Sequence, residues 1–306
     1  MEKYEVFFFG QFYLQHAGEG WRKAIHSKAW QIFWYLSSHR QRVQTRDTLA
    51  GLFWGGVPND HAKKQLRQAL WRLHAETRLS PQFAETRLVV VEAEQVYLNP
   101  ALEWWIDLED FDRAFSLVRQ ARCLNADLAT ALRRAIALYR GEFLEGCYDD
   151  WCLYERERLQ NQYLFMLDKL ADYCLSEGAY EEGFACGEKV LAINPCAERT
   201  YRQMMKLHYL MGNRPAALRQ YQQCQKVLRE ELGVSPSAAS QALYTQLCSD
   251  QLPPAGALPA PEHGPAPPSL QNVLNRLKQA QTTLTILQEQ IQQDIHLVEE
   301  LFLCQH

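Results

Sequence analysis

Cations and amide side chains recur on one side of a predicted helix that spans about residues 59–77. At about 100° per residue, the apolar side chains of this segment share one face. The apolar face consists of Ala62, Leu66, Ala69, Leu70 and Leu73. The opposite face consists of Lys63, Lys64, Arg67, Gln68, Trp71 and Arg72. Because lysine and arginine hold phosphates while arginine and glutamine reach base edges, this face predicts contact with double-stranded DNA in the major groove.

The alternative explanation is the solvated face of an ordinary helix, since charge on an outer helix face is common. The position of Trp71 disfavours this alternative, because a tryptophan that points toward solvent is unusual unless another surface packs on it. That surface could be DNA sugars, thymine methyl groups or a neighbouring hairpin. The cations outside this helix that could contact phosphate are Lys23, Lys28, Arg40, Arg42, Arg46 and Arg87.

The segments around this helix predict a winged helix. The first fifteen residues alternate bulky and polar side chains, which indicates a strand pair broken at Gly10. Helical periodicity begins at Ser27, and Thr45 is a candidate cap for a second short helix. After the basic helix, Leu88–Val91 and Gln95–Leu98 form a predicted hairpin. In a winged helix with this order of elements, the third helix is the one offered to the major groove.

The segment from Asp107 to about Asp250 is predicted to be helical throughout, with breaks at glycine and proline. Gly178 and Gly212 lie 34 residues apart, and each is followed by a helix rich in small residues. A helix-pair period of this length is typical of tetratricopeptide repeats.

After about residue 250 the sequence contains two segments of different composition. Residues 251–269 are rich in proline and alanine, which predicts a linker. Residues 270–306 carry apolar side chains in a heptad pattern, which predicts either a coiled coil or a helix folded back on its own domain. The proposed oligomerisation residues are Leu270, Leu277, Leu284, Leu287, Ile291, Val298 and Leu301.

Composition limits the class of protein. The chain has 306 residues, 47% hydrophobic and 22% charged, which allows sizeable cores and excludes global disorder. Its net charge of −4 combines +4 in residues 1–100 with −5 in residues 101–250 and −3 after them. No apolar run approaches the ~18 residues of a membrane helix, so no membrane contact is expected. The nine cysteines contain no Cys-x-x-Cys pair, which favours reduced thiols in the cytoplasm.

Signatures of catalysis are missing from the sequence. It contains no glycine-rich phosphate loop, no His-Glu-x-x-His and no Gly-x-Ser-x-Gly. The acidic pairs Asp149-Asp150 and Glu155/Glu157 could act as catalytic carboxylates or metal ligands, but such groups more often cap a helix or complement its dipole. We therefore predict no enzyme, no catalytic residue, no metal and no cofactor.

Several motifs resemble those of one family. They are Val6–Leu14, Lys28-Ala29-Trp30, Arg46–Leu49, Ala62–Leu73, Leu138–Gly146, Asp150-Trp151, Glu155–Leu159 and Leu228–Ser237. Together they resemble the Streptomyces antibiotic regulatory protein (SARP) family, in which an OmpR-type winged helix is joined to a bacterial transcriptional activator domain. The resemblance spans about residues 4–248.

The resemblance implies a sequence-specific transcription activator that binds direct repeats near a promoter and contacts RNA polymerase. It also implies that the helical domain supports dimerisation and regulation, so a homodimer is expected. The hairpin departs from the family pattern, because Glu92 and Glu94 stand where a wing usually offers basic residues. Arg87 is the nearest cation to the hairpin. Contacts between this hairpin and DNA are therefore the part of the resemblance that the sequence supports least.

The expected fold is mainly α. An N-terminal α+β winged helix-turn-helix occupies residues 1–102, and an all-α tetratricopeptide-like activator domain occupies residues 103–250. The linker and the heptad helix follow at residues 251–269 and 270–306. Two other functions stay open: a helical-repeat scaffold that binds a protein or peptide, and a regulator whose helical domain binds a small molecule or nucleotide.

The heptad segment generates a first prediction. A chain that ends at Pro253 should have a lower mass per particle than the full chain, because it lacks the proposed self-association helix. Light scattering of the two chains measures this, and an unchanged mass would show that the tail is not the main oligomeriser.

Overall fold

The computed structural model describes residues 3–16, 18–21, 27–40, 42–78 and 86–250. Met1–Leu252 forms one compact unit. The predicted linker and heptad helix lie outside the described residues, as does Lys23. None of the described helices is both long enough and apolar enough to span a membrane.

The N-terminal strands form a four-stranded sheet in the order β3-β2-β1-β7. Its members are β1 (Tyr4–Phe7), β2 (Tyr13–His16), β3 (Glu19–Trp21) and β7 (Trp104–Ile106). The predicted strand pair is confirmed, because β1 and β2 pair antiparallel. Sequence reasoning did not predict β7, which pairs parallel with β1 from beyond the predicted boundary at residue 102. That boundary stays a prediction.

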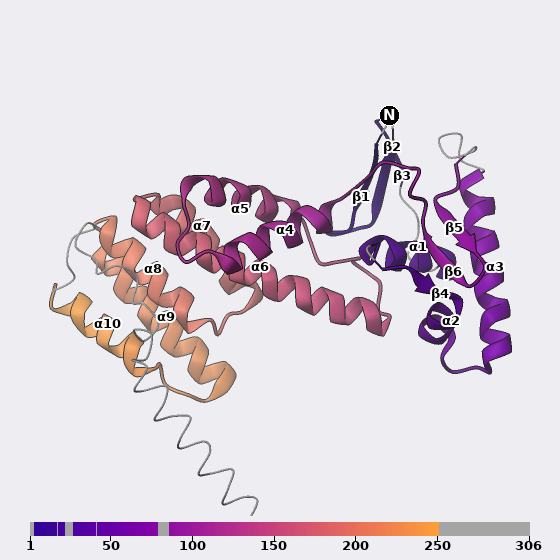
Figure 1. The fold of residues 1–306 in the computed structure, drawn as a ribbon. Helices are drawn as coiled ribbons and strands as arrows, with labels where there is room; N and C mark the ends of the chain where they lie inside the picture. Colours follow the sequence, from indigo (N-terminus) through magenta and orange to yellow (C-terminus); the bar gives the residue numbers. More distant parts are fainter. Residues whose placement is uncertain (1–2, 17, 22–26, 41, 79–85, 251–306) are drawn as a thin grey trace, which may run out of the picture. The chain divides into compact units, whose positions relative to one another are not determined.

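Three helices and a hairpin complete the winged helix, as predicted (Figure 1). The helices are α1 (Lys28–Ser38), α2 (Arg46–Trp54) and α3 (Asn59–Arg78), and β5 (Val89–Glu92), β6 (Gln95–Leu98) and the short β4 (Gln44–Thr45) form a three-stranded sheet. Thr45 caps α2 as predicted, because its side chain accepts a hydrogen bond from the Thr48 N–H. Ser27 is at the cap of α1 but makes no such bond.

The rest of the described chain is helical, which confirms the mainly α fold. The helices are α4 (Asp107–Gln120), α5 (Ala126–Leu138), α6 (Asp150–Glu177), α7 (Tyr180–Ile193), α8 (Glu198–Leu210), α9 (Arg214–Leu232) and α10 (Ala238–Cys248). Gly178 ends α6 and Gly233 ends α9 in the left-handed region, with φ of 78° and 69°, which glycine adopts without strain.

Small residues allow α7 to approach its neighbours closely. A methyl group on Gly187 would lie 2.9 Å from Met204 Cγ of α8. One on Gly183 would lie 3.1 Å from Cys174 Cβ of α6. This close packing of successive helices is what the small-residue pattern predicted for a tetratricopeptide-like arrangement.

The four-stranded sheet and helices α1 to α7 share one hydrophobic core, which continues from Tyr4 to Val190, and buried residues of α8 to α10 form separate clusters. Where they meet, Phe143 is fully buried, stacks on Phe8 at 5.4 Å between ring centroids and lies 6.2 Å from the Trp151 ring. Phe143 also forms an antiparallel bridge with Phe9. We call this meeting place, residues 8–10 packed against residues 141–152, the junction.

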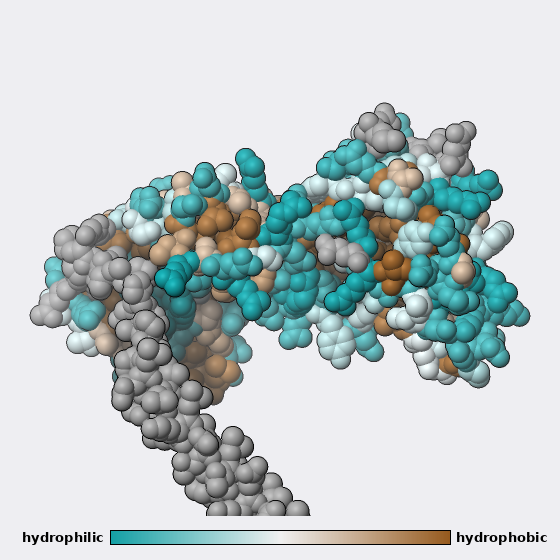
Figure 2. All heavy atoms as spheres, in the orientation of Figure 1, coloured by the Kyte–Doolittle hydropathy of each residue, from teal (hydrophilic) through white to brown (hydrophobic). Residues whose placement is uncertain are grey.

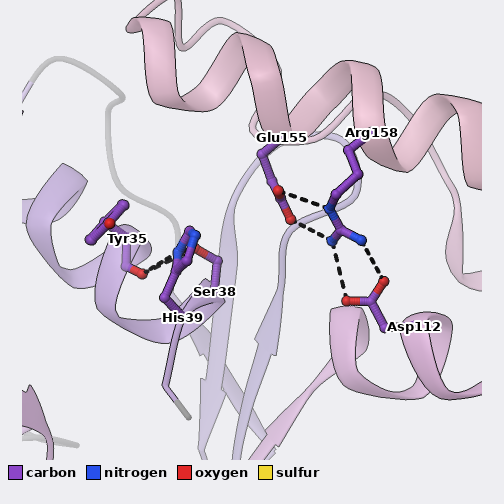
Figure 3. Close-up of polar contacts among 6 residues, drawn as sticks. All are labelled: Tyr35, Ser38, His39, Asp112, Glu155 and Arg158. Atoms are coloured by element: carbon purple, nitrogen blue, oxygen red, sulfur yellow. Dashed lines mark hydrogen bonds and ion pairs between the residues drawn. The ribbon is translucent and has the colours of Figure 1, made fainter. Parts of the chain in front are cut away.

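Polar contacts hold the elements around the junction. Arg156 of α6 donates to the carbonyls of Phe143, Leu144 and Cys147 at 2.9–3.1 Å. Arg158, two residues on, joins Asp112 of α4 to α6 and is shown in Figure 3 between that carboxylate and Glu155. The same figure shows the C-terminal turn of α1, where the His39 ring contacts the Tyr35 carbonyl and the Ser38 hydroxyl.

The junction generates a prediction about stability. Phe143→Ala should lower the free energy of unfolding by roughly 3–5 kcal/mol, because it leaves a cavity between the sheet and the helices. Tyr154→Ala, at an exposed position of α6, is the matched control and should stay within about 0.5 kcal/mol of the parent. Urea unfolding measures both, and equal effects would contradict the role given to Phe143.

Candidate nucleic-acid interface

The basic face predicted from the sequence forms one side of α3. Lys64, Arg67, Gln68, Trp71 and Arg72 are all exposed, and Figure 2 shows a largely hydrophilic surface in the region of α3. Trp71 is 69% exposed, so it is not covered by the hairpin or by any other part of the described chain. The outward direction predicted for Lys64 and Trp71 is therefore confirmed.

The opposite face of α3 fixes this orientation. All five side chains of the predicted apolar face are buried, and Thr77 joins them. Leu66 and Leu73, for example, are each 1% exposed. They pack into the core that α1 and α2 also enter. Because rotating the helix would expose these side chains to water, the basic face is held outward.

One member of the basic face already has a partner. The Lys63 ammonium lies 2.6 Å from Asp47 Oδ1 in the first turn of α2. The hydrogen bond and charge of Lys63 hold the pKa of Asp47 below its usual value, and Asp47 in turn raises the pKa of Lys63. Sequence reasoning did not find this pair. Within the described chain, no ion pair involves Lys64, Arg67 or Arg72.

The structure separates the other predicted cations into two groups. Arg42 and Arg87 are exposed, and Arg87 is close enough to His74 of α3 to act with burial in lowering the pKa of that histidine. Arg46 is half-buried, and its Nε is buried without a hydrogen-bond partner within the described chain. Arg42 and Arg87 thus keep a free guanidinium surface, whereas Arg46 is turned partly inward.

Two weaker candidates, Lys28 and Arg40, contact the helical region instead. The Lys28 ammonium lies 2.7 Å from Asp149 Oδ1, just before α6, and 5.6 Å from the Phe53 ring centroid. The Arg40 guanidinium lies 2.6 Å from Glu109 Oε1 of α4. The two ion pairs join residues more than 60 positions apart, so local sequence patterns could not have revealed them.

The hairpin presents the acidic tip that the sequence predicts. Glu92 and Glu94 are exposed on either side of Ala93, which has a φ of 49°. The Glu94 carbonyl accepts a hydrogen bond of 2.8 Å from the Arg46 N–H, which fixes the tip beside the start of α2. An exposed carboxylate repels phosphate, so the tip does not extend the basic surface of α3.

Clusters of side chains that could hold a metal ion are absent from the described part of the chain. The outer face of α3 presents the cations of Lys64, Arg67 and Arg72, the amide of Gln68 and the indole of Trp71. This set can bind phosphate and base edges without any covalent step.

The Lys63–Asp47 pair generates a prediction about titration. Lys63→Met should raise the pKa of Asp47 toward about 3.9, the value of an unperturbed aspartate. Lys64→Met changes the neighbouring lysine, which has no such partner, and should leave the pKa of Asp47 low. NMR titration of the side-chain carboxyl measures both, and a low pKa in both variants would contradict the pairing.

Comparisons with known proteins agree with this architecture. Residues 106–248 match the bacterial transcriptional activator domain. The regulatory protein AfsR of Streptomyces coelicolor is 27% identical over 209 residues, which make up 67% of this chain but 20% of AfsR. The chain thus spans about a fifth of the length of that relative. The transcriptional regulatory protein MoaR1 of Mycobacterium tuberculosis is 25% identical over 218 residues, 70% of this chain and 69% of MoaR1.

A solved structure shows the same fold. The structure of Mycobacterium tuberculosis EmbR in complex with a low affinity phosphopeptide superposes with a TM-score of 0.64. The match covers 83% of this chain and 67% of that one at 17% identity, so it supports the fold alone. This chain therefore contains a bacterial transcriptional activator domain at residues 106–248, and it is similar over about two thirds of its length to the regulatory proteins AfsR and MoaR1.

Proposed function

We propose that this protein binds double-stranded DNA with α3 in the major groove and activates transcription from promoter direct repeats. In this proposal it acts in the cytoplasm as a homodimer and contacts RNA polymerase. The proposed DNA contacts are Lys63, Lys64, Arg67, Gln68, Trp71, Arg72, Arg42, Arg46 and Arg87.

The exposed outer face of α3 is the observation that carries this proposal. Lys64, Arg67 and Arg72 keep their charge at the surface and have no ion pair within the described chain. An unpaired cation gains most from a phosphate, because no existing salt bridge has to break. Lys63 is the weakest of the proposed contacts on α3, since DNA would compete with Asp47 for its ammonium group.

Contact with a protein partner is supported by a separate surface. Tyr148, just before α6, and Leu153 and Tyr154, in its first turns, are 76%, 42% and 75% exposed. Tyrosine is enriched at protein–protein interfaces because its ring is large and its hydroxyl can still bond water or a partner. This surface supports the proposed contact with RNA polymerase, and it equally favours the second candidate function, a helical-repeat scaffold for another protein.

Charge reversal on α3 tests DNA binding. The double variant Lys64→Glu plus Arg67→Glu should weaken binding of a labelled random-sequence duplex by roughly a hundredfold, because two charged hydrogen bonds are lost. The slope of log K against log salt should become shallower by about 1.8, since about 0.9 is lost with each phosphate contact. Fluorescence anisotropy at several salt concentrations measures both quantities.

A matched control lies on another helix. Lys226→Glu plus Arg229→Glu changes two exposed cations with the same spacing on α9 and should bind DNA like the parent. If the parent bound no duplex at low salt, or if both double variants weakened binding equally, the assignment of α3 would be wrong. Partners that are retained through nuclease treatment and through the α3 variant would instead favour the scaffold.

A further inference from the structure

Trp71 is the one large apolar side chain in the middle of the basic face. Its ring makes no aromatic contact within the described chain, and 69% of its surface is exposed. Arg67 and Gln68 precede it by four and three residues, so they lie beside it on the same side of α3. Lys64 lies one further turn toward the start of the helix.

The chemistry of indole limits what Trp71 can recognise. Indole has one N–H donor and no acceptor, so it cannot make the paired hydrogen bonds with which arginine reads guanine or glutamine reads adenine. Its remaining surface is apolar. Among the four bases, thymine alone places an apolar group in the major groove, its 5-methyl. The base feature that matches Trp71 is therefore a thymine methyl group.

The position of Trp71 along α3 fits such a contact. A rise of about 1.5 Å per residue puts it about 10 Å from Lys64, about 6 Å from Arg67 and about 4.5 Å from Gln68 along the helix axis. Base pairs are about 3.4 Å apart, so these side chains reach neighbouring base pairs when the helix lies along the groove. The cations on both sides, including Arg72, hold the phosphates that frame this contact.

We infer that Trp71 is a specificity-determining residue that packs on a thymine 5-methyl group within the DNA site. This inference rests on the proposed function, because it requires α3 to enter the major groove. It adds a base preference next to the positions read by Arg67 and Gln68. Packing of the same ring on a deoxyribose would give affinity without a preference for any base, and the experiment below separates the two.

The test begins with a binding site selected by the full chain from a pool of random duplexes. Each thymine of that site is then replaced in turn by deoxyuridine, which lacks the 5-methyl group. Loss of the methyl contact should weaken binding by the parent about threefold to fourfold at one or two positions. Trp71→Ala should show no loss at those positions, whereas Trp71→Phe, which keeps an apolar ring, should retain it.

Leu232→Ala, which removes a 59% exposed apolar side chain from the end of α9, should show the same deoxyuridine pattern as the parent. Circular dichroism confirms that each variant is folded. An identical pattern for the parent and Trp71→Ala would overturn the inference. Uniform weakening of all duplexes by Trp71→Ala, with no deoxyuridine effect in the parent, would assign the ring to sugar contact instead. If no sequence were enriched from the pool, the proposed function itself would fail.

Discussion

Hydrogen bonding of buried backbone at the junction is the constraint on which the rest of the structure depends. The N–H groups of Phe8 and Phe9 are buried between the sheet and the helices, and both donate to Asp107 Oδ2, at 2.8 and 3.3 Å. Asp107 is fully buried, and burial raises its pKa to about 7 although these two N–H groups act in the opposite direction. An unpaired buried N–H costs about 1–3 kcal/mol, so these bonds hold the first strand against α4.

Ion pairs between separate elements determine which cations are left for a ligand. Lys28 and Arg40, at the two ends of α1, are paired with carboxylates of the helical region, and Lys63 is paired with Asp47. Of the exposed, unpaired cations of the described winged helix, Lys64, Arg67 and Arg72 share the outer face of α3, whereas Arg42 and Arg87 lie outside that face. In the proposed function, DNA would meet these three cations on the same helix face as Gln68 and Trp71.

Much of the fold could be predicted because its signals are local. The period of α3, the cap at Thr45 and the hairpin around Ala93 each depend on residues close together in the chain, and all three were predicted correctly. By contrast, β7 has three residues and pairs with a strand about 100 positions earlier. Such a strand is stabilised by its distant partner, and its own sequence carries too little pattern to predict it.

For the candidate site, the sequence by itself determined which residues share the outer face of α3, because a helical period fixes their directions once one face is buried. Only the tertiary structure decided which of those cations are available. Ion pairs such as Arg40–Glu109 depend on how separate elements pack, and Coulomb attraction acts on distance in space and not on separation in sequence. The same packing left Trp71 uncovered, which no local pattern could establish.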